Sequence, residues 1–212
     1  MPDTKMLNKE PIFIHIPKAG GKSMESFFKK INPRLRVGCL HMKASTWVDQ
    51  KKNSKKCFAL SEKERESAFI FSFVRNPFDR LLSAHAYLSR GYGNENDIKF
   101  GKTLNSSFRG FIKKDFLSFW KGEEFITGTG RLHFEPMINF INRDIDFIGR
   151  FENLQKDFNT VCDTIGVERK KLPHKNSTKH KHYTEYYDDE TREIVSKIYA
   201  KDIEYFGYKF GE

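Results

Sequence analysis

Short apolar segments alternate with amphipathic segments along the chain. The run Pro11–Ile16 is rich in β-branched residues, which predicts a buried strand. From Met24 to Ile31, apolar side chains recur at i, i+3, i+4 and i+7, the spacing of an amphipathic helix. Glycines lie between these two segments, so the chain opens with a strand, a glycine-containing turn and a helix.

Two further strand–helix pairs follow in the same order. The apolar run Ala68–Val74 predicts a second buried strand, and Pro77 suits the first turn of the helix after it. Asp146–Arg150 predicts a short strand, and periodic apolar residues predict a helix over Leu154–Ile165. Weaker patterns predict a strand over Leu35–Leu40, a loop over Gly91–Lys102, and helices over Phe108–Trp120, Glu135–Ile141 and Asp188–Tyr205.

This alternation predicts an α/β fold, a three-layer sandwich whose central, mostly parallel sheet has helices on both faces. We expect a polar tail over residues 1–10 and a single domain over residues 11–212. In such folds ligands bind at the carboxyl ends of the strands. Pro17–Ser23, His41 and Arg75–Ser83 each follow a predicted strand, so we expect them at one edge of the sheet.

Length and composition exclude several classes of protein. The 212 residues include 21 Phe, enough bulky apolar surface to exclude a disordered chain. We expect no transmembrane segment, because no apolar run approaches the roughly 18–20 residues required. We also expect no secretion signal, because the start of the chain is polar. The three Cys form no motif, so we expect a cytoplasmic protein without a disulfide framework.

The charge is strongly basic, with 38 Lys and Arg against 28 Asp and Glu, or +10 net. A basic surface suits nucleic acids, nucleotides, acidic glycans or peripheral contact with acidic membranes. A Lys-rich composition also keeps a protein in solution without any such partner. No recognised nucleic-acid motif is present, so we expect no nucleic-acid partner and keep a basic nucleic-acid-binding module only as an alternative.

The segment Lys18–Ser23 has the composition of a phosphate-binding loop. Gly20 and Gly21 permit close approach of the backbone, and the helix that follows offers unpaired N–H groups. An ordinary strand–helix turn is the alternative. The nucleoside triphosphatase loop requires a first glycine at position 16, which is Ile16, and an Asp for magnesium where the second strand instead ends in Arg75.

Arg75 and Ser83 predict a second anion site. The guanidinium group grips a phosphate through two hydrogen bonds, and the hydroxyl donates another. The alternative for Arg75 is a surface ion pair with Asp79. Two anion sites at neighbouring strand–helix junctions suit a nucleotide that carries phosphates at two positions.

The chain resembles the carbohydrate sulfotransferases, in the bacterial-type branch that is similar to heparan 2-O-sulfotransferase. The resemblance is scattered over most of residues 12–210. Its main motifs are Ile14–Gly21, Phe73–Ser83 and Gly149–Leu154, followed by Leu172–Ser177, Tyr186–Asp189 and Phe206–Phe210.

The resemblance implies a phosphate-loop-like sulfotransferase fold that binds 3′-phosphoadenosine-5′-phosphosulfate (PAPS) as donor and releases 3′-phosphoadenosine-5′-phosphate (PAP). By the same resemblance, Arg75 and Ser83 hold the 3′-phosphate. Lys22 departs from the family, which usually has Thr or Ser there. The residues implied to hold the 5′-phosphosulfate are Lys18, Ala19, Gly20, Gly21, Lys22 and Ser23, and those implied to close over the nucleotide are Ser177, Thr178 and Lys179.

We therefore predict an enzyme that transfers a sulfuryl group in line to a hydroxyl, with a glycan, neutral or anionic, as acceptor and no metal. Lys18 would stabilise the leaving phosphate, and His41 would take the hydroxyl proton. His133 and His15 are the alternative bases. The alternative function is a degenerate phosphate-loop kinase or nucleotide hydrolase.

Overall fold

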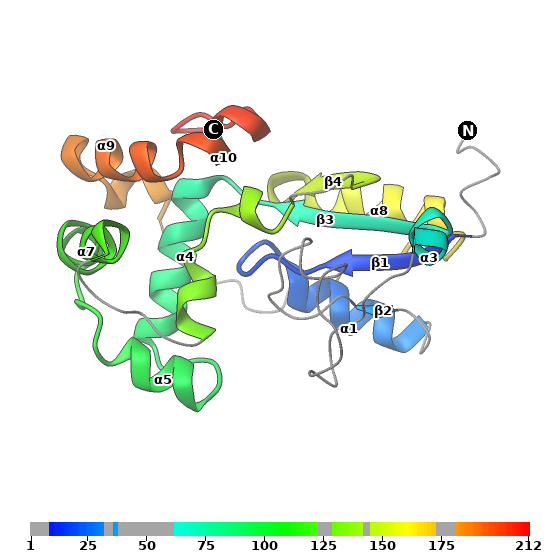
Figure 1. Cartoon of the computed structure of the whole chain (residues 1–212), viewed down its shortest axis with the longest axis horizontal. Coiled ribbons are helices and arrows are strands. Elements are labelled where there is room, and N and C mark those ends of the chain that lie inside the picture. Colours follow the sequence, from blue (N-terminus) through cyan, green and yellow to red (C-terminus); the bar gives the residue numbers. More distant parts are fainter. Residues whose placement is uncertain (1–8, 32–35, 38–61, 123–128, 142–144, 173–180) are drawn as a thin grey trace. The chain divides into compact units, whose positions relative to one another are not determined.

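The computed structural model describes residues 9–31, 36–37, 62–122, 129–141, 145–172 and 181–212. Within it the chain divides into two compact units (Figure 1). The first comprises Met1–Arg75 and Met137–Ser177, and the second comprises Asn76–Pro136 and Thr178–Glu212. The expectation of a single domain stays a prediction.

A parallel sheet forms the centre of the first unit. Its four strands run in the order β2-β1-β3-β4, and every pairing is parallel. This confirms the predicted α/β fold with a parallel sheet. Phe13 pairs with Phe71, and Phe73 pairs with Gly149. The strands are β1 (Glu10–Ile14), β2 (Arg36–Val37), β3 (Ala68–Val74) and β4 (Phe147–Arg150).

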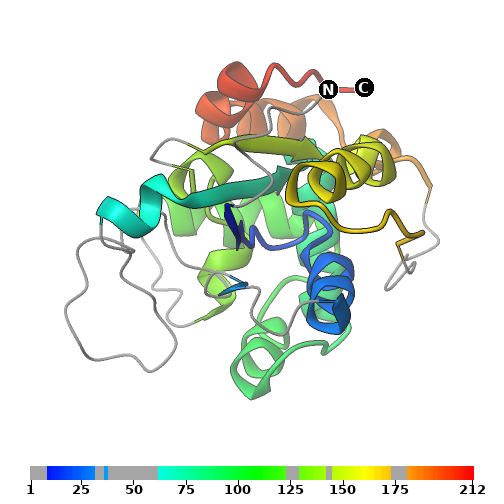
Figure 2. The same ribbon diagram turned by 90° about the vertical axis from the view of Figure 1, so that its right-hand side faces the viewer.

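Aromatic side chains join the sheet to two helices. The helices α1 (Gly21–Ile31) and α8 (Leu154–Ile165) lie on the same side of the sheet (Figure 2). The ring of Phe28 on α1 lies 5.7 Å from that of Phe71 on β3 and 5.7 Å from that of Phe158 on α8. All seven residues of β3 are buried, as expected for a central parallel strand. The first unit also contains the short helix α3 (Glu62–Glu66).

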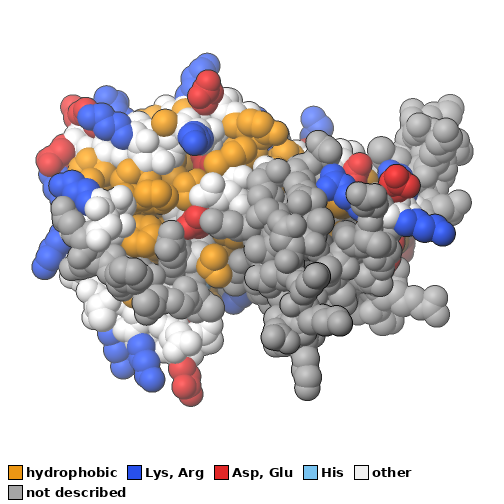
Figure 3. Space-filling view, in the orientation of Figure 1, with side chains coloured by type: hydrophobic (Ala, Val, Ile, Leu, Met, Phe, Trp, Pro, Cys, Tyr) orange, Lys and Arg blue, Asp and Glu red, His pale blue; other side chains and the backbone are white. Residues whose placement is uncertain are grey.

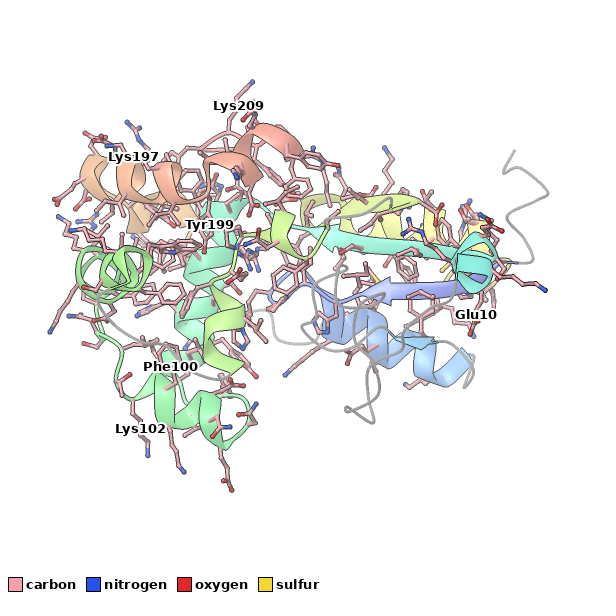
Figure 4. All side chains as sticks on the ribbon, in the orientation of Figure 1. Glu10, Phe100, Lys102, Lys197, Tyr199 and Lys209 are labelled. Carbon is pink, nitrogen blue, oxygen red and sulfur yellow. The ribbon has the colours of Figure 1, made fainter. Side chains whose placement is uncertain are left out.

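The second unit is helical. Its apolar core includes Phe78, Phe111 and Tyr199, the last of which is labelled in Figure 4. The Tyr199 hydroxyl donates to the carbonyl of Phe134 over 2.7 Å. Arg80 is fully buried and donates to the carbonyl oxygens of His133 and Glu135. The helices are α4 (Pro77–Ser89), α5 (Glu95–Gly101), α6 (Phe108–Phe111), α7 (Leu117–Lys121), α9 (Asp189–Ile198) and α10 (Ala200–Phe206).

Three expectations for this unit need correction. The predicted loop Gly91–Lys102 contains α5, because Asn94 forms a reciprocal capping box with Asp97. The predicted helix Phe108–Trp120 is divided by a π-turn over Ile112–Phe116. The predicted final helix breaks near Tyr199, which lies between α9 and α10.

Two further expectations need correction. The predicted strand Pro11–Ile16 ends at Ile14, and the predicted helix Glu135–Ile141 is reduced to a 3-10 turn over Met137–Asn139. Of the predicted strand Leu35–Leu40, the structure describes Arg36–Val37, which is β2. Within the described part of the chain, no helix is both long and apolar enough to cross a membrane.

Replacement of the buried Phe28 tests the importance of this aromatic core. Phe28 is 0% exposed, so Phe28→Ala removes ring contacts to both β3 and α8 and leaves a cavity. We expect the free energy of unfolding to fall by about 3–5 kcal/mol. The control Tyr205→Ala, at a side chain that is 61% exposed, should cost less than about 1 kcal/mol. Urea denaturation measures both values, and equal losses would contradict this description of the core.

Candidate anion-binding site

The segment between β1 and α1 has an unusual backbone. Lys18 adopts φ of +67°, and among the described residues other than glycine it alone has a positive φ. This left-handed conformation costs about 1–2 kcal/mol for a residue with a Cβ. Ala19, which follows, is 1% exposed. The surrounding structure therefore holds the backbone of Lys18 in a conformation that it would not adopt alone.

Gly20 is favoured by its positive φ, and Gly21 lies too close to a neighbouring side chain to carry a Cβ. At Gly20, where φ is +87°, a Cβ would lie 3.0 Å from the Cδ1 of Leu154. At Gly21, the first residue of α1, a Cβ would lie 2.1 Å from the Nε2 of His15. The turn is thus packed against both the start of α8 and the His15 ring, and glycine is favoured at each position.

Arg75 follows β3 and reaches the same turn. Its Nη1 donates a hydrogen bond to the carbonyl of Lys18 over 3.2 Å. Its guanidinium carbon lies 4.1 Å from the centre of the Phe151 ring, a cation–π contact, and only 7% of Arg75 is exposed. Because β1 and β3 are parallel neighbours, the segments that follow them meet at one edge of the sheet, as predicted for this pair.

Positive charges gather at this edge. The pKa of Lys18 is lowered from 10.5 to about 7, mainly by burial and further by the charges of Arg75 and Lys22. The first turn of α1 contains no acidic residue. Its N-terminus adds the positive end of the helix dipole. An anion bound here would relieve this repulsion, and that is the chemistry the arrangement supports.

The remaining predicted site residues are placed as follows. Lys22 is exposed, and Ser23 is 7% exposed with its backbone N–H donating to the carbonyl of Gly20. Ser83 is partly buried on α4, in the second unit. The structure thus brings the Lys18–Ser23 segment and Arg75 together. His41, Ser177, Thr178 and Lys179 lie outside the described residues, so their roles stay predictions.

Two of the candidate bases are buried. His15 is 4% exposed, and its Nδ1 lies 2.9 Å from the Oε1 of Glu25. His133, in the second unit, is 5% exposed with its Nε2 4.0 Å from the Oδ1 of Asp97. His85 packs against Phe111 in the core of the second unit, and burial lowers its pKa.

Three contacts of the site were not predicted from the sequence. They are the support of Arg75 by Phe151, the packing of Leu154 against Gly20, and the pairing of His15 with Glu25. Phe151 and Leu154 lie within the motif Gly149–Leu154, which was the only sequence signal for them. Among the described residues, no group of three or more His, Cys, Asp or Glu is arranged to hold a metal ion.

Comparison with known proteins gives three findings. An uncharacterized protein of Archaeoglobus fulgidus is 29% identical over 121 residues, which are 57% of this chain and 81% of that protein. A crystal structure of a sulfotransferase from Alicyclobacillus acidocaldarius is similar over 92% of this chain and 93% of that one, with 14% identity and a TM-score of 0.48. The model of the sulfotransferase family matches residues 8–209. Because this match spans nearly the whole chain, including the turn after β1 and Arg75, the chain belongs to the sulfotransferase family.

Proposed function

We propose that this protein transfers a sulfuryl group from PAPS to a hydroxyl group of a carbohydrate. One observation carries the proposal: Lys18, Lys22 and Arg75 gather at the glycine turn before α1, where burial, together with the charges of Arg75 and Lys22, lowers the pKa of Lys18 to about 7. A polyanionic donor is the ligand that this charge distribution favours. Membership of the sulfotransferase family favours sulfuryl transfer over the kinase or nucleotide hydrolase alternative.

The turn fits the 5′-phosphosulfate end of the donor. The start of α1 offers backbone N–H groups and the positive end of the helix dipole to an anion, and Lys18 and Lys22 compensate its charge. Lys22 stands where the family usually has a hydroxyl, so we propose that it contributes a second cation instead. The donor supplies a sulfuryl group already activated by its link to a phosphate. Ala19 and Ser23 complete the proposed set in the turn.

Arg75 and Ser83 are proposed to bind the 3′-phosphate. Arg75 is held in advance by its hydrogen bond to the carbonyl of Lys18 and by the Phe151 ring, which reduces the entropy it loses on binding. The assignments of Ser83 and of Ser177, Thr178 and Lys179 rest on the family resemblance alone.

In the proposed reaction a bond forms between the acceptor oxygen and sulfur while the bond from sulfur to the 5′-phosphate oxygen breaks. The electron pair of the broken bond stays on that phosphate oxygen, where Lys18 stabilises the charge. The hydroxyl proton moves to His41. Both alternative bases are buried beside a carboxylate, since His15 pairs with Glu25 and His133 lies near Asp97. The assignment to His41 rests on its place after a predicted strand and on the family resemblance.

The acceptor is proposed to be a glycan hydroxyl. The net charge of +10 suits an anionic polysaccharide. On the described part of the face in Figure 3, Lys and Arg side chains are interspersed with Asp and Glu rather than gathered in one stripe.

The donor assignment is tested by thermal shift. We expect PAP to raise the melting temperature of the protein and ATP with magnesium to have little effect, since ligand at 100 times Kd adds roughly 2.7 kcal/mol of stability. Arg75→Ala should abolish most of the shift, because the 3′-phosphate loses its paired cation. Lys197→Ala, at an exposed residue in the second unit, is the control. Stabilisation by ATP with magnesium alone would instead support the kinase alternative.

Proton uptake tests the role of Lys18. With a pKa of about 7, Lys18 is mostly neutral at pH 8, and phosphate groups beside it should restore its charge. We therefore expect PAP binding to take up a proton at pH 8 and little at pH 6. Calorimetry in buffers of different ionisation enthalpy measures this uptake. Lys18→Arg, which stays charged throughout, should bind PAP without it, and equal uptake by both proteins would contradict the assignment.

The same shift predicts how stability depends on pH. Between pH 7 and about 10.5 the folded protein holds Lys18 neutral, whereas the unfolded chain keeps it protonated. The unfolded state therefore binds more protons, and the contribution of Lys18 to the free energy of unfolding rises with pH across this window. Relative to Lys18→Met, the ligand-free protein should gain stability from pH 7 to pH 10 in urea denaturation. If the free energies of unfolding of the two proteins differ by the same amount at every pH, the pKa of Lys18 is not lowered.

His41→Ala tests the proposed base. Because general base catalysis contributes about 10²–10⁴-fold, we expect kcat to fall by that factor while the Kd for PAP stays within a few-fold. His182→Ala, at an exposed histidine, is the matched control. Labelled PAPS and a panel of glycans supply the assay. Turnover near that of the unsubstituted protein would move the role to His133 or His15.

A further inference from the structure

A buried polar pair joins the end of β1 to the second turn of α1. His15 follows β1 directly, and its ring stacks on that of Phe13 with centres 5.7 Å apart and planes at 21°. Its Nδ1 lies 2.9 Å from the Oε1 of Glu25, which is 9% exposed. Because a carboxylate only accepts, we assign the bridging proton to Nδ1 of His15.

The opposite edge of the same ring supports the first turn of α1. A Cβ on Gly21 would lie 2.1 Å from the Nε2, 2.2 Å from the Cδ2 and 2.7 Å from the Cε1 of His15. Gly21 and Glu25 are four residues apart, so they lie on the same face of α1, one turn from each other. The side chain of His15 therefore contacts α1 at two successive turns.

We infer that His15 and Glu25 are positioning residues that fix the first turn of α1 against the end of β1, and so shape the anion-binding turn between them. The turn has little freedom, because Lys18 is in the left-handed region and its carbonyl accepts from Arg75. A small movement of the first turn of α1 would displace the N–H groups that face the anion. Errors of about 1 Å in such groups are costly to binding and catalysis. The identity of the bound anion rests on the proposed function, whereas the contacts of His15 with Glu25 and Gly21 do not depend on it.

The polar character of the pair favours this role over core filling. Burying two ionisable groups costs solvation that apolar side chains of the same volume would not lose. Phe27 and Phe28, on the same helix, fill the adjacent core with rings alone. A hydrogen bond between His15 and Glu25 fixes the angle of the imidazole, which stacking alone would leave adjustable.

Conservative substitutions separate positioning from packing. His15→Asn places an amide nitrogen near the position of Nδ1 and keeps donation to Glu25, whereas His15→Gln places it near Nε2 and loses that bond. We expect His15→Gln and Glu25→Leu to weaken PAP binding and raise the KM for PAPS at least tenfold, with the acceptor KM within a few-fold. His15→Asn and Glu25→Gln should stay within about threefold of the unsubstituted protein. Equal losses in all four variants would overturn the inference.

A suppressor experiment tests the contact with Gly21 directly. Gly21→Ala should weaken PAP binding at least tenfold, because its Cβ meets the imidazole. Adding His15→Ala should restore several-fold of that loss, although His15→Ala alone weakens binding. Gly149→Ala is the matched control, since its Cβ would meet Phe73 at 2.4 Å and not His15, so His15→Ala should not rescue it. Additive effects of Gly21→Ala and His15→Ala would overturn the inference.

Hydrogen exchange separates this inference from the proposed function. In ligand-free protein we expect His15→Gln and Glu25→Leu to speed exchange of the backbone amides in residues 18–24 at least tenfold. Amides within α8, in the same unit, should be unchanged. If the unsubstituted protein binds no PAP, the proposed function fails while this measurement still decides the positioning role. Unchanged exchange in residues 18–24 would overturn it.

Discussion

The parallel pairing of β1 with β3 is the constraint on which the site depends. With Phe13 paired to Phe71, both strands end at the same edge of the sheet, and the segments that follow them meet there. Arg75 can reach the carbonyl of Lys18 only because these two strands are neighbours. A sheet with another strand order would separate the two cations and leave a glycine turn without its second source of charge.

Binding capacity at this edge is obtained at the expense of stability. The site combines a left-handed lysine, cations at the positive end of a helix and no acidic residue in the first turn of that helix. Each feature lowers the stability of the ligand-free protein, and a bound anion removes the repulsion between the positive charges. Such local costs, retained in a fold that is otherwise well packed, are typical of sites selected for function.

The supporting contacts explain how the strain is maintained. Phe151 and Leu154 hold Arg75 and Gly20 from the side of α8, and His15 holds Gly21 from the side of β1. Behind them, Phe28, Phe71 and Phe158 form an aromatic layer between the sheet and the two helices. The turn is therefore enclosed by side chains whose own positions are fixed by packing and hydrogen bonds.

Local sequence patterns determined much of the first unit. The run Ala68–Val74 and the periodic segment Leu154–Ile165 became β3 and α8 with the expected bounds, because hydrophobic period and flanking residues act over neighbouring positions. The anion-binding turn was identified in the same way, from two glycines and lysines at a strand–helix junction. Capping was harder to recognise, and α5 was missed because its capping box is formed by residues of a segment with a loop-like composition.

Only the tertiary structure decided which distant residues complete the site. The contacts of Arg75 with Phe151 and of His15 with Gly21 depend on which faces of the strands and helices pack together. The spacing of residues in the sequence does not show which faces these are. The lowered pKa of Lys18 likewise arises from burial and from a charge brought close by strand order. The sequence alone determined the main strands and helices of the first unit, the chemistry of the turn and the likeness to sulfotransferases. Tertiary packing decided which side chains hold the turn and Arg75 in place, because these contacts join segments that are far apart in the chain.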